Sequence, residues 1–165
     1  MADTNDESLM SQLMRLLPGY GGYRDRESRR EDDRITRQFL SQRLNDCKSA
    51  CDLLGNQAVS AGNLELPSVL ESVRARIEGV RNRLDSAVEG YSGWFTTHSV
   101  DVELLQRVCE ADQRLVSYVD QIDNLLREIA EKSKTFDAGK IRSLIDNLDR
   151  GIDRRNEILS SPTVH

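Results

Sequence analysis

The sequence has no apolar run long enough to cross a membrane. A spanning helix needs about 18 consecutive apolar residues, and charged or polar residues interrupt every apolar stretch of this chain well before that length. The first residues are acidic rather than basic, unlike the start of a secretory signal peptide. We therefore expect a cytoplasmic protein.

Cysteine and histidine are scarce, at three and two residues. An odd number of cysteines does not make a disulfide framework. Cys47 and Cys51 are one helical turn apart, and Cys109 with His98 would complete four zinc ligands. Both members of the first pair fall on an apolar stripe, however, where free cysteine packs as a small hydrophobe. The sequence therefore predicts core cysteines and no bound metal.

Motifs of catalysis and cofactor binding are also missing. The chain lacks a phosphate-binding glycine loop, the Glu-x-x-His pairs of di-iron bundles and a haem-attachment motif. Its two histidines, in a loop and at the end of the chain, leave little for acid–base catalysis. We expect neither enzyme activity nor a cofactor.

Excess positive charge is absent, since the formal net charge is −5. Nucleic-acid-binding proteins normally present a basic surface, so we expect no nucleic-acid partner. Residues 1–17 contain three acidic groups and a single arginine, which opposes attraction to anionic lipids. Peripheral membrane attachment is therefore the weakest of the alternatives considered below.

Prolines number only three in 165 residues, and 31% of the residues are charged, as is typical of long amphipathic helices. Four stretches carry apolar residues at alternating spacings of three and four, which is the pattern of a bundle core. They cover positions 40–58, 66–91, 105–129 and 141–159. The sequence predicts an all-α fold in which residues 24–165 form an antiparallel, up-down-up-down four-helix bundle.

Residues 1–23 form a separate N-terminal unit in this prediction. A short amphipathic helix ends at Pro18-Gly19, and the Tyr20-Gly21-Gly22-Tyr23 stretch predicts a hinge or a shaped loop, because adjacent glycines disfavour helix. The following run, 24–34, is almost entirely charged with both signs balanced, which predicts a solvated helix face. The apolar face of the short helix consists of Leu9, Met10, Leu13, Leu16 and Leu17.

Aromatic residues make up only 5% of the chain, and the predicted topology gathers most of them at one end of the bundle. We call this group the aromatic pole: Tyr20, Tyr23, Tyr91, Trp94, Phe95 and His98. Tyrosine and tryptophan provide large, rigid contact areas with a polar group, so the aromatic pole is a candidate binding site with an exposed apolar patch. The alternative is that these rings close the open end of the core.

Two polar residues interrupt otherwise apolar stripes, Asp112 in the third and Arg155 in the fourth. Antiparallel pairing of these two helices about residue 135 brings position 155 within one turn of Asp112. The sequence predicts a structural ion pair that is buried or half-buried and that helps to fix helix register. A ligand-binding charge inside the bundle is the alternative interpretation.

The N-terminal stretch also carries a resemblance. Leu16-Leu17-Pro18-Gly19-Tyr20-Gly21-Gly22-Tyr23 and the following Arg24-Asp25-Arg26-Glu27-Ser28-Arg29-Arg30-Glu31 resemble the opening of some uncharacterised bacterial helical-bundle proteins. The resemblance covers about a tenth of the chain. It implies a bacterial origin and no particular activity.

These observations predict a non-enzymatic protein–protein interaction or scaffold module. Its partner would be another protein or a second copy of the chain, and the aromatic pole would provide the contact. The first alternative is a helical bundle that binds a small ligand or a metal. The second is a peripheral membrane protein.

Overall fold

The computed structural model describes residues 3–86, 102–132 and 136–160. Five helices occur in these ranges: α1 (Asp3–Leu16), α2 (Arg29–Ser60), α3 (Leu66–Ser86), α5 (Val102–Lys132) and α6 (Ala138–Ser160). No strand occurs in them, so the predicted all-α fold class is confirmed. None of the described helices is both long enough and apolar enough to span a lipid bilayer.

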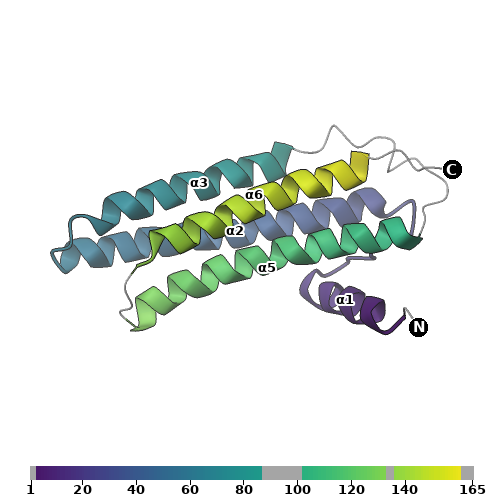
Figure 1. Cartoon of the computed structure of the whole chain (residues 1–165), viewed down its shortest axis with the longest axis horizontal. Helices are drawn as coiled ribbons and strands as arrows, with labels where there is room; N and C mark the ends of the chain where they lie inside the picture. Colours follow the sequence, from purple (N-terminus) through teal and green to yellow (C-terminus); the bar gives the residue numbers. More distant parts are fainter. Residues whose placement is uncertain (1–2, 87–101, 133–135, 161–165) are drawn as a thin grey trace.

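Helices α2, α3, α5 and α6 pack side by side as a helical bundle (Figure 1). Helices α2 and α6 each contact both α3 and α5. Helices α3 and α5, in contrast, lie on opposite sides of the bundle. Each helix thus uses two of its faces for packing, as the wide apolar stripes in the sequence require.

The directions of neighbouring helices follow from contacts between them. Arg43 of α2 pairs with Asp120 of α5 at 2.6 Å, and Thr36 of α2 lies 3.4 Å from Asp112 of α5, so these two helices run parallel. Contacts between α2 and α3 run in opposite directions along the two helices, since Arg37 lies near Leu84 and Asp52 lies near Arg74. Helices α3 and α5 lie diagonally across the bundle from one another. The fifteen residues at 87–101 connect this diagonal pair, and a chain of that length reaches roughly 50 Å when extended.

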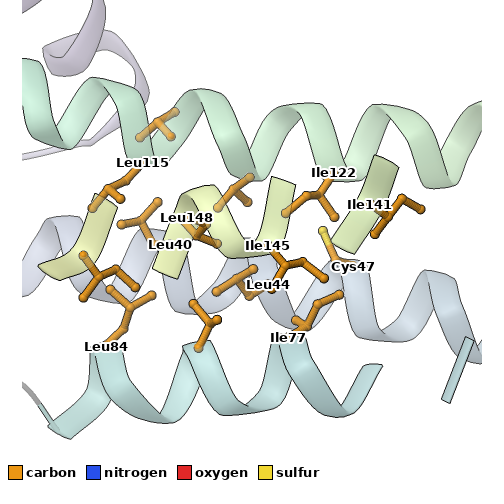
Figure 2. Close-up of a cluster of buried hydrophobic side chains, with 14 of the residues drawn as sticks. Leu40, Leu44, Cys47, Ile77, Leu84, Leu115, Ile122, Ile141, Ile145 and Leu148 are labelled. Atoms are coloured by element: carbon orange, nitrogen blue, oxygen red, sulfur yellow. The ribbon is translucent and has the colours of Figure 1, made fainter. Parts of the chain in front are cut away.

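The core lies along the bundle axis and includes most of the residues that the three–four spacing predicts. Figure 2 shows side chains from all four packed helices meeting in it. Cys47 and Cys51 belong to this core, with 0% and 2% exposure, and both are free thiols. The labelled residues are Leu40, Leu44, Cys47, Ile77, Leu84, Leu115, Ile122, Ile141, Ile145 and Leu148.

Helix α1 lies beside the four packed helices and packs against α5 (Figure 1), where its buried face joins the same core. Leu13 and Leu17 are buried there, but Leu16 and Met14 remain 47% and 42% exposed. The loop that follows α1 turns sharply, since Gly19 and Gly22 adopt φ values of 86° and 68°, which glycine tolerates without steric cost. The predicted hinge or shaped loop is thus a shaped loop, and it leads directly into α2.

Candidate functional site

Arg155 and Asp112 form a fully buried ion pair between α6 and α5. Nε of Arg155 lies 2.5 Å from Oδ1 of Asp112, and the two side chains are 2% and 0% exposed. The structure thus contains the contact that the antiparallel register of these helices predicts. Burial alone would lower the pKa of Arg155, but the nearby carboxylates of Asp112 and Asp33 outweigh it and raise this pKa, so the guanidinium stays charged.

The two tyrosines of the N-terminal loop form hydrogen bonds with this ion pair. The hydroxyls of Tyr23 and Tyr20 donate to Oδ2 of Asp112 at 2.7 and 3.1 Å. Nη2 of Arg155 in turn donates to the hydroxyl of Tyr23 at 2.8 Å. Burial raises the pKa of both tyrosines, and the Asp112 carboxylate raises it further. Both phenols therefore remain protonated donors, as a buried carboxylate requires.

Helix α2 adds a second carboxylate that bridges two arginines. Asp33 Oδ1 lies 2.9 Å from Nη2 of Arg155, and Asp33 Oδ2 accepts a hydrogen bond from Nε of Arg37 at 2.9 Å. Arg37 also approaches the carbonyl of Leu84 in α3, at 3.4 Å. The contacts therefore link all four packed helices to the N-terminal loop.

Asp32 holds the loop in its turned conformation. Its two carboxylate oxygens accept hydrogen bonds from the backbone N–H groups of Gly21 and Tyr23, at 2.7 and 2.8 Å. Tyr23 has a φ of 62°, which is uncommon for a residue with a side chain. The rings of Tyr20 and Tyr23 meet edge to face with centroids 5.5 Å apart. We call the whole assembly the polar network: Tyr20, Tyr23, Asp32, Asp33, Thr36, Arg37, Asp112 and Arg155.

The structure changes the interpretation of two members of the aromatic pole. Tyr20 and Tyr23 are only 4% and 0% exposed, because their rings pack in the core and their hydroxyls bind Asp112. They are therefore not part of an exposed patch. The other four predicted site residues lie outside the described residues: Tyr91, Trp94, Phe95 and His98.

The predicted solvated face at 24–34 is wrong in part. Arg29, Asp32 and Asp33 are buried, as is Arg37 in the next turn. These residues continue the core stripe backward from Leu40 at spacings of three and four, so the periodicity was present in the sequence. It was missed because charged residues occupy it, and these are buried only where they have polar partners. Asp33 pairs with Arg37 and Arg155, whereas Asp32 and Arg29 bind backbone groups of the N-terminal loop.

Burial also decides the chemistry open to the thiols. It raises the pKa of Cys47 to about 12 and the pKa of Cys51 and Cys109 to about 11. A thiol that stays protonated is a poor nucleophile and a poor metal ligand. No group of three or more His, Cys, Asp and Glu side chains in the described part of the chain is arranged to hold a metal ion.

An apolar cavity of about 340 Å³ lies between α1 and α5, next to the polar network. Cys109 lines it and also lies 3.4 Å from the hydroxyl of Tyr20, so the cavity and the network share a wall. The residues around the cavity are Leu9, Met10, Arg24, Val102, Leu105, Gln106 and Cys109.

No family model, no curated protein and no solved structure matches the chain.

Proposed function

We propose that the chain is a non-enzymatic protein-interaction module whose binding surface lies between α1 and α5. The apolar cavity between these helices is the observation that carries the proposal. It lies outside the bundle core, its lining is mainly aliphatic, and Val102 at its edge is 68% exposed. A concave apolar surface of this kind suits the insertion of an apolar side chain from a partner.

One exposed apolar residue of α1 extends the surface. Met14 lies one helical turn beyond Met10, which lines the cavity, and so shares its face of the helix. Its side chain is 42% exposed. Single exposed apolar residues are ordinary, but exposed Met14 and Val102 on either side of an apolar cavity indicate an interaction site. We infer that the partner presents an amphipathic helix or strand with one or two apolar anchors.

The polar network has a supporting role in this proposal. It ties the loop after α1 to α2, α5 and α6, and so holds one wall of the cavity against the other. A binding surface that is ordered before the partner arrives loses less conformational entropy on association. The four longer helices would serve as an up-down-up-down scaffold for this surface.

The partner in this proposal is another cytoplasmic protein or a second copy of the chain. Tyr91, Trp94, Phe95 and His98 precede Val102 in the sequence. We retain them as candidate contacts for the partner. Their rings would extend the apolar contact, and the polar groups of Tyr91, Trp94 and His98 would lie at its rim.

The test compares two matched substitutions, Val102→Glu at the cavity and Leu64→Glu at the far end of the bundle. The two residues are 68% and 77% exposed, so neither change disturbs a core. We expect wild type and Leu64→Glu to capture the same protein from a native lysate, or to show the same self-association by light scattering. Val102→Glu should lose this interaction, because it places a charge on the apolar contact.

Two results would contradict the proposal. In the first, Val102→Glu retains the captured protein or the oligomeric state at the wild-type level. In the second, both substitutions reduce the interaction equally, which would place the contact elsewhere.

A further inference from the structure

Helices α5 and α6 enclose a groove on the outer edge of the bundle, separate from the cavity at α1. The groove has a volume of about 360 Å³. Each helix contributes two arginines to it, and Glu110 is its one acidic residue, which makes a formal charge of +3 in a chain whose net charge is −5. We call it the arginine groove after Arg107, Arg114, Arg150 and Arg154.

At other edges of the bundle, arginines are neutralised across the helix interface. Arg83 of α3 pairs with Asp149 and Asp153 of α6, and Arg43 of α2 contacts Asp120 of α5 at 2.6 Å. The same pattern recurs in the pair Arg76–Asp146. Opposite charges therefore face one another along these edges.

The arginine groove lacks this compensation. Arg114 has one distant ion pair, at 3.7 Å to Glu110 on its own helix, and Arg150 donates to the neutral amide of Asn147 at 2.8 Å. Arg107 and Arg154 have no hydrogen-bond or ion-pair partner within the described ranges. Four guanidinium groups thus line one small space, where their mutual repulsion is relieved when an anion binds between them.

The floor of the groove is apolar and close to the core. Gly151 lies there, and a Cβ atom at this position would be 2.8 Å from Cδ2 of Leu115. The absence of a side chain therefore lets α5 and α6 approach closely beneath the arginines. Tyr118 and Ile158 provide half-buried apolar surface beside it. A bound molecule would contact guanidinium groups on one side and apolar side chains on the other.

From this arrangement, we propose that the arginine groove binds a small organic phosphate such as a nucleoside diphosphate. Guanidinium groups bind phosphate oxygens in a bidentate fashion. A terminal phosphate group carries roughly −1.5 to −2 charges at neutral pH, and the inner phosphate of a diphosphate adds one more, so a diphosphate comes close to balancing the groove, whereas a carboxylate carries only one charge. The volume suits a ligand of this size. An extended nucleic acid would need a longer basic surface than this acidic chain offers.

The test measures ADP binding by isothermal titration calorimetry. Wild type is compared with Arg107→Gln/Arg154→Gln, and Arg127→Gln serves as a matched control, because Arg127 is an exposed arginine of the same helix outside the groove. We expect the double variant to bind ADP at least about tenfold more weakly, as the loss of charge-assisted hydrogen bonds implies. The control should bind like wild type. Circular dichroism should show unchanged helicity in both variants.

Other ligands define what would overturn the proposal. Equal ADP affinity in wild type and the double variant would overturn it, and so would equal loss in the Arg127→Gln control. If inorganic pyrophosphate binds as tightly as ADP, the ligand is not an organic phosphate, since the apolar floor would then add nothing to the affinity. Binding of an acidic peptide or a single-stranded oligonucleotide without binding of ADP would overturn the small-ligand assignment. These results are independent of the surface at α1.

Discussion

At the scale of single residues, the polar network shows why charge is tolerated in the core of this bundle. Asp112 accepts hydrogen bonds from two tyrosines and pairs with Arg155, and Asp33 shares the same arginine. Desolvation of buried charges is expensive, and only a complete set of partners offsets it. Each member of the network therefore depends on the presence of the others.

The first prediction concerns Arg155→Met. The substitution keeps an apolar stem but leaves Asp112 and Asp33 buried without their shared guanidinium. We expect it to lower the free energy of unfolding by about 3–5 kcal/mol, measured by urea denaturation with circular dichroism. The control is Arg127→Gln, which removes the ion pair between the exposed Arg127 and the buried Asp123 but leaves Arg43 3.6 Å from that carboxylate, so it should cost less than about 1 kcal/mol. If the two changes lower the free energy of unfolding equally, the buried network contributes no more to stability than the Arg127–Asp123 pair, which contradicts the prediction.

At the scale of elements, the loop between α1 and α2 decides where α1 packs. Gly22 has a positive φ, and a Cβ atom there would overlap the side chain of Met10. The loop thus brings its backbone against α1 at the same point where Asp32 binds it from α2. Helix α1 is positioned by this loop as well as by its own apolar face.

A pair of glycine substitutions tests this assignment. Gly22→Ala should destabilise the protein by at least about 1 kcal/mol, because alanine disfavours positive φ and its methyl group displaces Met10. Gly79→Ala should stabilise it by about 0.5–1 kcal/mol, since Gly79 lies in the helical part of α3 with no neighbouring side chain within 4 Å of its Cβ position. Urea denaturation measures both. Stabilisation by Gly22→Ala would refute the close contact with α1.

The helices were more predictable from sequence than the site. Apolar spacing located the core stripes of the four packed helices and the ion pair between Asp112 and Arg155, because register follows from periodicity and turn position. The roles of Tyr20 and Tyr23 were not predictable, since local sequence does not show whether a ring faces solvent or a buried carboxylate. Asp33 was missed for a similar reason: composition marked its segment as exposed, and only tertiary pairing makes its burial favourable.

At the scale of the whole molecule, the start of α2, the end of α3, the start of α5 and the end of α6 lie at one pole (Figure 1). The polar network lies near this pole, and α1 packs beside it. The opposite end carries the α2–α3 turn with the exposed Leu64. The cavity at α1 and Leu64 thus lie at opposite ends of the bundle.

Global stability should fall at alkaline pH. The folded-state pKa of Cys47, Cys51 and Cys109 is raised by burial from 9.0 to about 11–12, and the pKa of Tyr20 and Tyr23 is raised above 10.0. The unfolded state therefore loses these protons first as pH rises. The stabilisation is complete below about pH 9 and is lost above it, by about 1.4 kcal/mol per pH unit for each group that is ionised only in the unfolded state.

Urea midpoints at pH 8, 9, 10 and 11 measure this effect. The chain has only four lysines among its 23 basic residues, so loss of lysine charge contributes little in this range. A steady fall in the midpoint above pH 9 is the expected result. A midpoint that stays constant up to pH 11 would show that the thiols and phenols are not buried as described.

The most direct test of the proposed interaction surface is photo-cross-linking in living cells. A photoreactive amino acid is placed at Leu105, which lines the apolar cavity, and separately at Leu53, which is 55% exposed on α2 and does not line the cavity. The proposed function predicts a discrete cross-linked species, with a partner protein or a second copy, from position 105 and none from position 53. The same species from both positions, or from position 53 alone, would contradict it.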